Sequence, residues 1–296
     1  MTDAKVKALV LAGFGINCDY ETQYALQKAG AETDRVHINR LIQWSHEGKG
    51  LENYHILAVD GGFAWADDHG AGVLLGLKLK SYLGDDIAEF IAAGKLVIGS
   101  CNGFQALVNM GLLPGFDNDY QTRSVALAAN DGGTYRDDWV HLIVNQDSPC
   151  VFTKGIERME IPIRHGEGKF YAPEQTIQRL IDQNQVVMRY AKPVVVQARR
   201  RDPSQAPVPP ELAPADGKFP HNPNGSLHDI AGICDPTGRI FGLMPHPEAF
   251  HHLTNHPQWT RILDHPRRWG RNLPEMEGYG LKIFHNAVEY VRSNLI

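Results

Sequence analysis

The stretch KLVIGSCNGFQALV, residues 95–108, decides the fold of this chain. Its apolar first part predicts a strand and its last part a helix, with a tight G-x-C-x-G turn between them. Gly99 and Gly103 flank Cys101 as glycines flank the nucleophile in the strand-turn-helix elbow of hydrolases, because such a strained turn favours residues without a Cβ. The turn would place the Cys101 sulfur at a helix N-terminus, where unpaired N–H groups favour the reactive thiolate. The segment therefore predicts a sulfur nucleophile; the alternative is a cysteine that packs as a small buried hydrophobe.

Around this turn, apolar strands alternate with helices. The predicted strands cover 6–11, 31–37, 54–59 and 96–98, and the predicted helices cover 19–30 and 71–93. This alternation indicates an α/β fold with a parallel sheet that is covered on both faces. Because functional groups in such folds gather at the carboxyl ends of the strands, the turns at Gly13, Gly61 and Cys101 can converge on one crevice.

The second half of the chain has a different pattern. Short strands are predicted at 139–144, 159–163 and 185–190, followed by a hairpin at 230–242 and an amphipathic helix at 280–291. These strands indicate an antiparallel or mixed addition to the sheet. Residues 199–225 are rich in proline and polar residues, so we expect a long surface loop there rather than a domain linker. We therefore expect a single domain over residues 1–296.

The composition disfavours several kinds of function. The 296 residues are 43% hydrophobic and carry a formal net charge of -5 without a sustained basic run, which argues against nucleic-acid binding. No apolar run is long enough to span a bilayer, and the N-terminal residues lack the apolar region of a secretion signal. The four cysteines, at 18, 101, 150 and 234, lack the short spacing of a zinc site. We therefore expect free thiols, no metal and a cytoplasmic protein.

The tripeptide His246-Pro247-Glu248 supplies the base that a cysteine nucleophile needs. Proline keeps its neighbours out of the α region, so we expect an extended segment in which residues two apart point to the same side. Glu248 would then orient His246 toward the Cys101 sulfur. The alternative is that His246 merely ends a strand near a loop. Four other histidines are interpreted as surface or loop residues, because their spacing suits no metal: His251, His252, His256 and His265.

The turn Asp60-Gly61-Gly62-Phe63 is the candidate oxyanion hole. A glycine lets a backbone N–H approach a developing negative charge closely. The N–H groups of Gly62 and Asn102 would donate to the same oxygen. A plain strand-to-loop turn is the alternative interpretation of this motif.

The cysteine and histidine motifs, GSCNGFQ and MPHPE, resemble those of class I (triad) glutamine amidotransferases. Within that class, further pieces resemble the family of glutaminase subunits of phosphoribosylformylglycinamidine synthases. They are GINCD at 15–19, DGGF at 60–63, CNGFQAL at 101–107, GLLPG at 111–115, IPIRHGEGK at 161–169, NPNGS at 222–226 and DIAGICDPTGR at 229–239. The pieces occur in order and cover almost the whole chain. This resemblance implies a three-layer, flavodoxin-like fold with a mostly parallel central sheet and an added antiparallel section.

The resemblance also implies a reaction. Cys101 would attack the carboxamide carbon of glutamine, while the Gly62 and Asn102 N–H groups hold the oxyanion. His246 would protonate the departing ammonia and then activate water to hydrolyse the glutamyl thioester. Gln105 would help to bind the glutamine. Two residues of the H-G-E-G piece, His165 and Glu167, would line the pocket or face a partner protein.

A partner protein is a further implication of the family. The chain has no Gly-rich phosphate cradle, so we expect ATP and Mg²⁺ on a separate synthetase subunit and no cofactor on this chain. That subunit would aminate formylglycinamide ribonucleotide with the released ammonia, and the involvement of a small third subunit is left open. Asp60 stands where the family more usually has proline, and Ala249 where it has a basic residue. Cys18 is interpreted as structural.

Two other classes of function stay open at this point. The first is another enzyme on the same fold: a glutaminase that serves a different synthetase, or a cysteine hydrolase that acts alone. The H-G-E-G and N-C-D pieces argue against it. The second is a catalytically silent subunit that only scaffolds the synthetase, against which the intact Cys101, His246 and Glu248 argue.

Overall fold

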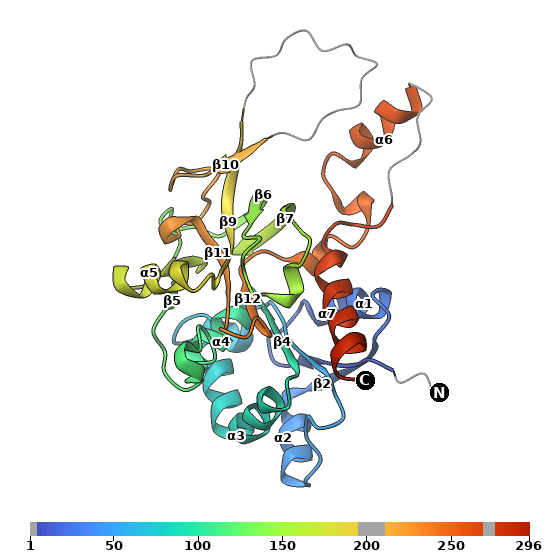
Figure 1. Cartoon of the computed structure of the whole chain (residues 1–296), viewed down its shortest axis with the longest axis vertical. Coiled ribbons are helices and arrows are strands. Elements are labelled where there is room, and N and C mark those ends of the chain that lie inside the picture. Colours follow the sequence, from blue (N-terminus) through green and yellow to red (C-terminus); the bar gives the residue numbers. More distant parts are fainter. Residues whose placement is uncertain (1–4, 195–210, 269–275) are drawn as a thin grey trace.

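The core of the protein is a ten-stranded sheet with a parallel half and an antiparallel half (Figure 1). The computed structural model describes residues 5–194, 211–268 and 276–296, and only the backbone at 265–268. The strands follow the order β2-β1-β3-β4-β12-β11-β9-β6-β7, and β10 pairs with β9. The parallel half contains β2 (Glu32–His37), β1 (Lys7–Ala12), β3 (Ile56–Val59), β4 (Leu96–Ser100) and β12 (Ile240–Leu243). Its order is that of flavodoxin-like sheets, which confirms the predicted fold class.

The antiparallel half extends this sheet beyond β12. It contains β11 (Ile230–Cys234), β9 (Val186–Pro193), β6 (Arg136–Val144), β7 (Arg158–His165) and β10 (Leu212–Pro214). A separate two-stranded sheet pairs β5 (Ala126–Ala128) with β8 (Lys169–Tyr171). The predicted hairpin at 230–242 is present as β11 and β12.

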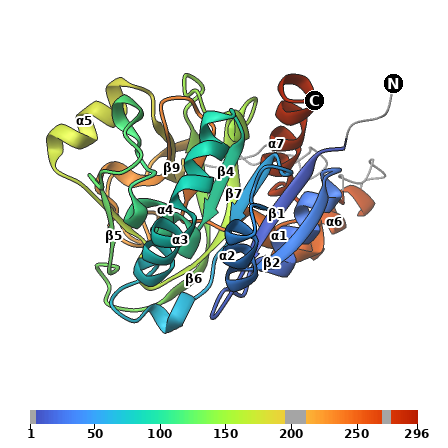
Figure 2. The same ribbon diagram turned by 90° about the horizontal axis from the view of Figure 1, so that it is seen from below.

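Helices cover both faces of the sheet, so the architecture has three layers (Figure 2). One face carries α2 (Ile38–His46), α3 (Val73–Ala92), α4 (Asn102–Met110) and α5 (Glu174–Asp182). The other face carries α1 (Asp19–Lys28) and α7 (Leu281–Asn294). Alternate residues of β1 serve the two layers, because successive side chains of a strand point to opposite faces: Leu9 and Leu11 pack in one core and Ala8 and Val10 in the other. The remaining helix, α6 (Trp259–Arg268), projects from the main body (Figure 1).

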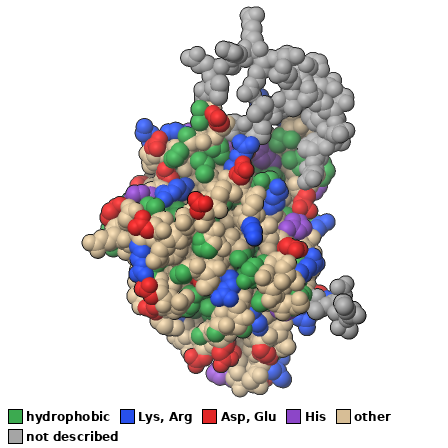
Figure 3. Space-filling model, viewed as in Figure 1, with side chains coloured by type: hydrophobic (Ala, Val, Ile, Leu, Met, Phe, Trp, Pro, Cys, Tyr) green, Lys and Arg blue, Asp and Glu red, His purple; other side chains and the backbone are tan. Residues whose placement is uncertain are grey.

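The surface carries both signs of charge. Acidic and basic side chains are interspersed on the face in Figure 3, and no broad basic patch gathers on it. Within the described residues, no helix is both long and apolar enough to cross a membrane.

Two predictions about surface segments need correction. Residues 199–210 of the predicted loop lie outside the described residues, but the part from 211 onward is integrated into the fold. Here β10 pairs with β9, and Asn222 and Asn224 are buried because polar partners in the fold satisfy their amides. The prediction that His256 is a surface or loop residue holds only for the loop, because this residue is buried against the rings of Trp139 and Phe250. The side chain of His265 lies outside the described residues.

Helix α4 begins unusually close to the end of β3. A Cβ built on Gly103 would lie 1.8 Å from the carbonyl oxygen of Val59, so no side chain fits between helix and strand. Gly99 meets the same helix: its Cβ would lie 2.9 Å from the backbone nitrogen of Phe104. The flanking glycines of the G-x-C-x-G turn are therefore needed for a close backbone approach.

We expect Gly103→Ala to lower the free energy of unfolding by about 3 kcal/mol, because the backbone of α4 or β3 must shift to admit the methyl group. The measurement is urea denaturation followed by circular dichroism. Gly84→Ala is the matched control, because Gly84 lies within α3 and no atom lies within 4 Å of its Cβ position. This substitution should raise the free energy of unfolding by about 0.5–1 kcal/mol. Equal effects of the two substitutions would contradict the close approach.

Candidate active site

The candidate site lies at the carboxyl edge of the parallel strands, where four segments meet. They are 13–18 after β1, 60–63 after β3, Cys101 after β4 and 244–248 after β12. The chain runs outward from β1 to β2 and then crosses to β3 on the other side of β1, which makes this edge a topological switch point. Two of the segments are tied together, since the N–H groups of Asn17 and Cys18 both donate to the carbonyl of Gly61 at 3.2 Å.

Cys101 occupies the strained position that the glycine-flanked turn predicts. Its φ is 50° and its ψ is -107°, a conformation that a non-glycine residue adopts only at a cost. It immediately precedes α4, and its N–H donates to the carbonyl of Leu243 at 2.8 Å. Its thiol lies 3.5 Å from the carbonyl oxygen of Arg164. The sulfur is thus held at a helix N-terminus, next to the strand that delivers the histidine.

His246 and Glu248 form a buried pair. The His246 Nδ1 atom lies 2.5 Å from Glu248 Oε1, and the two residues are only 2% and 1% exposed. The prediction of an extended tripeptide is wrong in detail: Pro247–Ala249 form a 3-10 turn, with proline at its first position. His246 precedes this turn with an extended φ of -110°, and the tight turn returns Glu248 to its ring.

The candidate catalytic groups are close neighbours across Gly61. A Cβ built on Gly61 would lie 2.7 Å from His246 Cε1, 3.1 Å from Cys18 Sγ and 3.4 Å from Cys101 Cβ. Any side chain at this position would therefore intrude between the thiol and the imidazole. His246 Nε2 is buried, and no residue that the structure describes forms a hydrogen bond with it. That nitrogen is free to exchange a proton with a bound substrate.

The electrostatics of the pair favour a charged imidazole. Burial by itself would lower the pKa of His246, but the Glu248 carboxylate and the thiols of Cys101 and Cys18 outweigh it and raise the pKa well above its ordinary value. Burial raises the pKa of Cys18 to about 11, so Cys18 stays a neutral thiol at neutral pH. Burial also raises the pKa of Asp60 well above its usual range.

Cys18 lies nearer to the chemistry than a purely structural residue would. Its sulfur is 3.8 Å from His246 Nδ1, on the side of the imidazole that faces Glu248. The ligand atoms of these three residues lie within 4.8 Å of one another, which makes them a potential metal-binding group in the described part of the chain. The short bond between His246 and Glu248 already uses both of their facing atoms.

The predicted oxyanion donors are available. The bridge between Ile16 and Gly62 uses the N–H groups of Asn17 and Phe63, and within the described ranges no atom accepts from the Gly62 N–H. Asn102 is the first residue of α4, where backbone N–H groups have no partner within the helix. Both N–H groups can therefore donate to an oxyanion next to Cys101.

Gln105 is buried among polar groups of neighbouring segments. Its Nε2 donates to the carbonyl of Glu167 at 2.5 Å, and its Oε1 accepts from Asn102 Nδ2 at 3.0 Å. Asn102 Nδ2 also donates to Asp67 at 2.9 Å, and Glu167 Oε2 accepts from the N–H of Ala71 at 3.1 Å. Asp67 was not predicted, because it lies in a turn with left-handed residues that no sequence pattern marks.

His165 does not reach the surface of the candidate site. It is buried, and burial, with a smaller effect of His246, lowers its pKa to about 3. Its ring nitrogens contact Asn130 Oδ1 at 3.2 Å and Asn224 Nδ2 at 3.4 Å. Neither asparagine was predicted from the sequence. Asn224 belongs to the NPNGS piece, whose proline, glycine and polar residues are typical of a surface turn.

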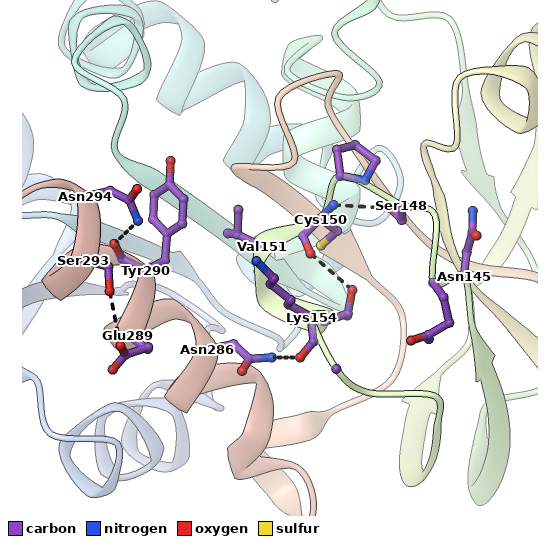
Figure 4. Close-up of a pocket in the computed structure, with 14 residues that line it drawn as sticks. Asn145, Ser148, Cys150, Val151, Lys154, Asn286, Glu289, Tyr290, Ser293 and Asn294 are labelled. Atoms are coloured by element: carbon purple, nitrogen blue, oxygen red, sulfur yellow. Dashed lines mark hydrogen bonds between the residues drawn. The ribbon is translucent and has the colours of Figure 1, made fainter.

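A cavity of about 560 Å³ lies at the opposite edge of the sheet, far from Cys101 in the topology. Figure 4 shows Ser148 and Cys150 on one of its sides and residues of α7 on the other. Asn286 of α7 closes one end by donating to the carbonyl of Lys154 at 3.0 Å. None of the residues predicted to act in catalysis lines this cavity.

Comparison with known proteins gives one consistent result. A family model described as a CobB/CobQ-like glutamine amidotransferase domain matches residues 5–291. Phosphoribosylformylglycinamidine synthase subunit PurQ of Methanococcus maripaludis is 46% identical over 284 residues, covering 96% of this chain and 97% of the relative. The subunit of the same name from Dehalococcoides mccartyi is 43% identical over 289 residues, or 98% and 99% of the two chains. A chain of the PurLQS structure from Thermotoga maritima superposes with a TM-score of 0.64 at 28% identity, covering 97% of this chain and 100% of that chain.

We expect Glu248→Gln to lower the pKa of His246, because the carboxylate charge that opposes the effect of burial is removed. In the wild type the imidazole should keep its proton to well above pH 6.5, and in the variant it should lose it at lower pH. The measurement is an NMR titration of histidine ring signals. Glu277→Gln is the control, because Glu277 pairs with the exposed His285 at 2.9 Å and should leave His246 unchanged.

Proposed function

The chain belongs to the CobB/CobQ-like glutamine amidotransferase family, and we propose from this premise that it is the glutaminase subunit of a phosphoribosylformylglycinamidine synthase. It hydrolyses glutamine to glutamate and ammonia. The ammonia passes to a synthetase subunit, which converts formylglycinamide ribonucleotide into formylglycinamidine ribonucleotide in purine (IMP) biosynthesis. The observation that carries the proposal is the strained Cys101 at a helix N-terminus beside the buried His246–Glu248 pair.

The first half of the reaction forms a thioester. The Cys101 sulfur attacks the carboxamide carbon of glutamine, and the oxygen becomes an oxyanion that accepts from the N–H groups of Gly62 and Asn102. His246 donates its proton to the amide nitrogen, the C–N bond breaks, and ammonia leaves. The raised pKa of His246 suits this step, since the imidazolium holds the proton that the leaving group needs.

The second half returns the enzyme to its starting state. His246, now neutral, accepts a proton from water while the water oxygen attacks the thioester carbon. The C–S bond breaks, glutamate leaves, and the Cys101 sulfur is again paired with a protonated His246. Glu248 stays ionised throughout and stabilises the imidazolium through the bond to Nδ1.

The pocket around Gln105 suits the amino-acid end of glutamine. Burial and the nearby Glu167 carboxylate raise the pKa of Asp67, while a bond from Asn102 opposes the rise. A cation between Asp67 and Glu167 would relieve this repulsion, and the α-ammonium group of glutamine is such a cation. We expect no cofactor on this chain, ATP and Mg²⁺ on the synthetase, and a cytoplasmic location, in keeping with four free cysteines.

An aromatic rim, defined as Phe14, Phe63 and Tyr135, supports a partner at this edge. The three side chains are 53%, 43% and 49% exposed and follow β1, follow β3 and precede β6, so all three lie at the edge that holds Cys101. The rings of Phe63 and Tyr135 are 6.0 Å apart. Exposed aromatic groups around a site are typical anchors of a protein interface, and a synthetase seated here would receive ammonia without loss to solvent.

We expect Cys101→Ala to lower glutamate release from glutamine by at least about 10³-fold, since the other thiol at the site, Cys18, keeps its proton because burial raises its pKa to about 11. The assay uses wild type and variant, each with and without the synthetase subunit, nucleotide and ribonucleotide substrate. Synthesis from free ammonia should persist with the variant. If the wild-type complex uses free ammonia but releases no glutamate from glutamine, the chain is a catalytically silent scaffold. If glutamate release is stimulated only by a different synthetase, the chain serves a different pathway.

We expect Phe14→Ser to weaken binding of the synthetase subunit by about tenfold, because the exposed ring would be buried in the complex. Glutaminase activity of the free chain should stay unchanged. Surface plasmon resonance with immobilised synthetase measures the affinity. Tyr82→Ser is the matched control, because Tyr82 is also 53% exposed but lies on α3. An equal loss in both variants would remove the aromatic rim from the interface.

A further inference from the structure

We propose that Asn130, His165 and Asn224 are positioning residues for glutamine binding, an inference that rests on the proposed function. They form a buried polar cluster behind the pocket, and none of them is in a catalytic motif. The cluster holds residues 165–168, the end of the segment 162–168, so that the Glu167 carbonyl can orient Gln105.

Segment 162–168 supports three functional residues through its backbone. The carbonyl of Pro162 accepts from the His246 N–H at 2.8 Å. The carbonyl of Arg164 accepts from the Cys101 thiol at 3.5 Å, and that of Glu167 accepts from Gln105 Nε2 at 2.5 Å. The nucleophile, the base and the predicted glutamine-binding residue thus share one short support.

This support is not fixed by the sheet alone. β7 is the last strand of the sheet order and ends at His165, so residues 166–168 have left the ladder with β6. The Glu167 carbonyl, which orients Gln105, lies in this unpaired part. Side-chain hydrogen bonds must therefore do what strand pairing does for the earlier residues.

Asn130 supplies the first set of these bonds. Its Nδ2 donates to the carbonyl of His165 at 2.9 Å, and its Oδ1 accepts from the N–H of Gly168 at 3.0 Å. Its own backbone N–H donates to the carbonyl of Gly166 at 2.9 Å. One asparagine thus binds the segment on both sides of Glu167.

Asn224 supplies the second set from the other side. Its Nδ2 donates to the carbonyl of Gly168 at 2.8 Å and to the Tyr190 hydroxyl at 3.1 Å. Its Oδ1 accepts from the backbone N–H and the hydroxyl of Ser226, which fixes the orientation of the amide. The amide therefore presents a donor, not an acceptor, toward His165.

These orientations determine the tautomer of His165. Asn130 Oδ1 can only accept, so a neutral imidazole with its proton on Nδ1 satisfies it. His165 Nε2 then lies 3.4 Å from Asn224 Nδ2, whose two hydrogens are directed to the Gly168 carbonyl and the Tyr190 hydroxyl. Gly168 packs directly on the ring: a Cβ there would lie 2.3 Å from His165 Cε1. The ring thus packs tightly between Asn130 and Asn224. Loss of either asparagine side chain leaves buried polar atoms without a hydrogen-bond partner.

The test measures glutamine binding in a Cys101→Ala background, by calorimetry on the full chain alone and with the synthetase subunit. Adding Asn224→Ala should weaken binding about tenfold, because Gln105 loses its fixed acceptor. Adding Asn145→Ala is the matched control: Asn145 also donates two side-chain hydrogen bonds, to Asn184 and Val186, but at the opposite edge of the sheet. Equal binding by the Asn224 and Asn145 variants would overturn the proposal.

Kinetics of the active chain give a second readout that a general loss of stability would not produce. Asn224→Ala should raise the KM for glutamine about tenfold and change kcat by less than about twofold. The rate at which Cys101 reacts with iodoacetamide should also change by less than about twofold. A loss confined to kcat, with an unchanged KM, would contradict a role in glutamine binding.

A pair of His165 variants keeps the proposal falsifiable if Asn224→Ala does not fold. His165→Asn retains a neutral amide that can donate to Asn130, whereas His165→Leu fills a similar volume without a polar atom. We expect His165→Asn to bind glutamine more strongly than His165→Leu, and equal binding by the two variants would overturn the proposal. Failure of the Cys101→Ala parent to bind glutamine at all would instead reject the proposed function.

Discussion

The contact between the start of α4 and the end of β3 is the constraint on which the site depends. A Cβ on Gly103 would lie only 1.8 Å from the Val59 carbonyl oxygen, so helix and strand touch through their backbones. That contact forces the chain to turn sharply after β4, and Cys101 takes the left-handed conformation in which its sulfur faces the neighbouring strand ends. The strain at Cys101 is stable only because the packed helix and the parallel sheet determine the positions on both sides of it.

The electrostatic arrangement follows from this burial. His246 and Glu248 are almost fully buried, and removing two charged groups from water costs free energy. Their attraction across the 2.5 Å contact offsets that cost when both groups are charged. Burial also acts on two further titratable groups: it raises the pKa of Asp60, and it raises the pKa of Cys18 to about 11, so that Cys18 stays a neutral thiol at neutral pH. Next to Glu248, the thiols of Cys18 and Cys101 are the polar groups that act on the imidazole.

The sequence predicted those parts of the molecule whose causes are local. The strand-turn-helix around Cys101, the parallel strands and the proximity of His246 and Glu248 follow from glycine placement, apolar runs and proline. Asp67 could not be found in this way, because its place beside Asn102 depends on a turn that folds against a distant helix. Asn224 was missed for a related reason: polar residues next to proline and glycine look solvent-exposed until their partners, from β9 and the turn before β8, are known.

The two halves of the sheet therefore have different roles in one site. The parallel strands present the reacting groups at their carboxyl ends, as switch-point geometry requires. The antiparallel strands supply backbone acceptors, and β7 provides Pro162 and Arg164 to His246 and Cys101 from a strand that neither residue belongs to. An edge strand has one unpaired side, so its continuation is free to bend toward the pocket, but it then needs the asparagine cluster to keep a defined shape. The antiparallel addition is thus part of the candidate site, since it supplies backbone acceptors to His246 and Cys101 of the parallel half.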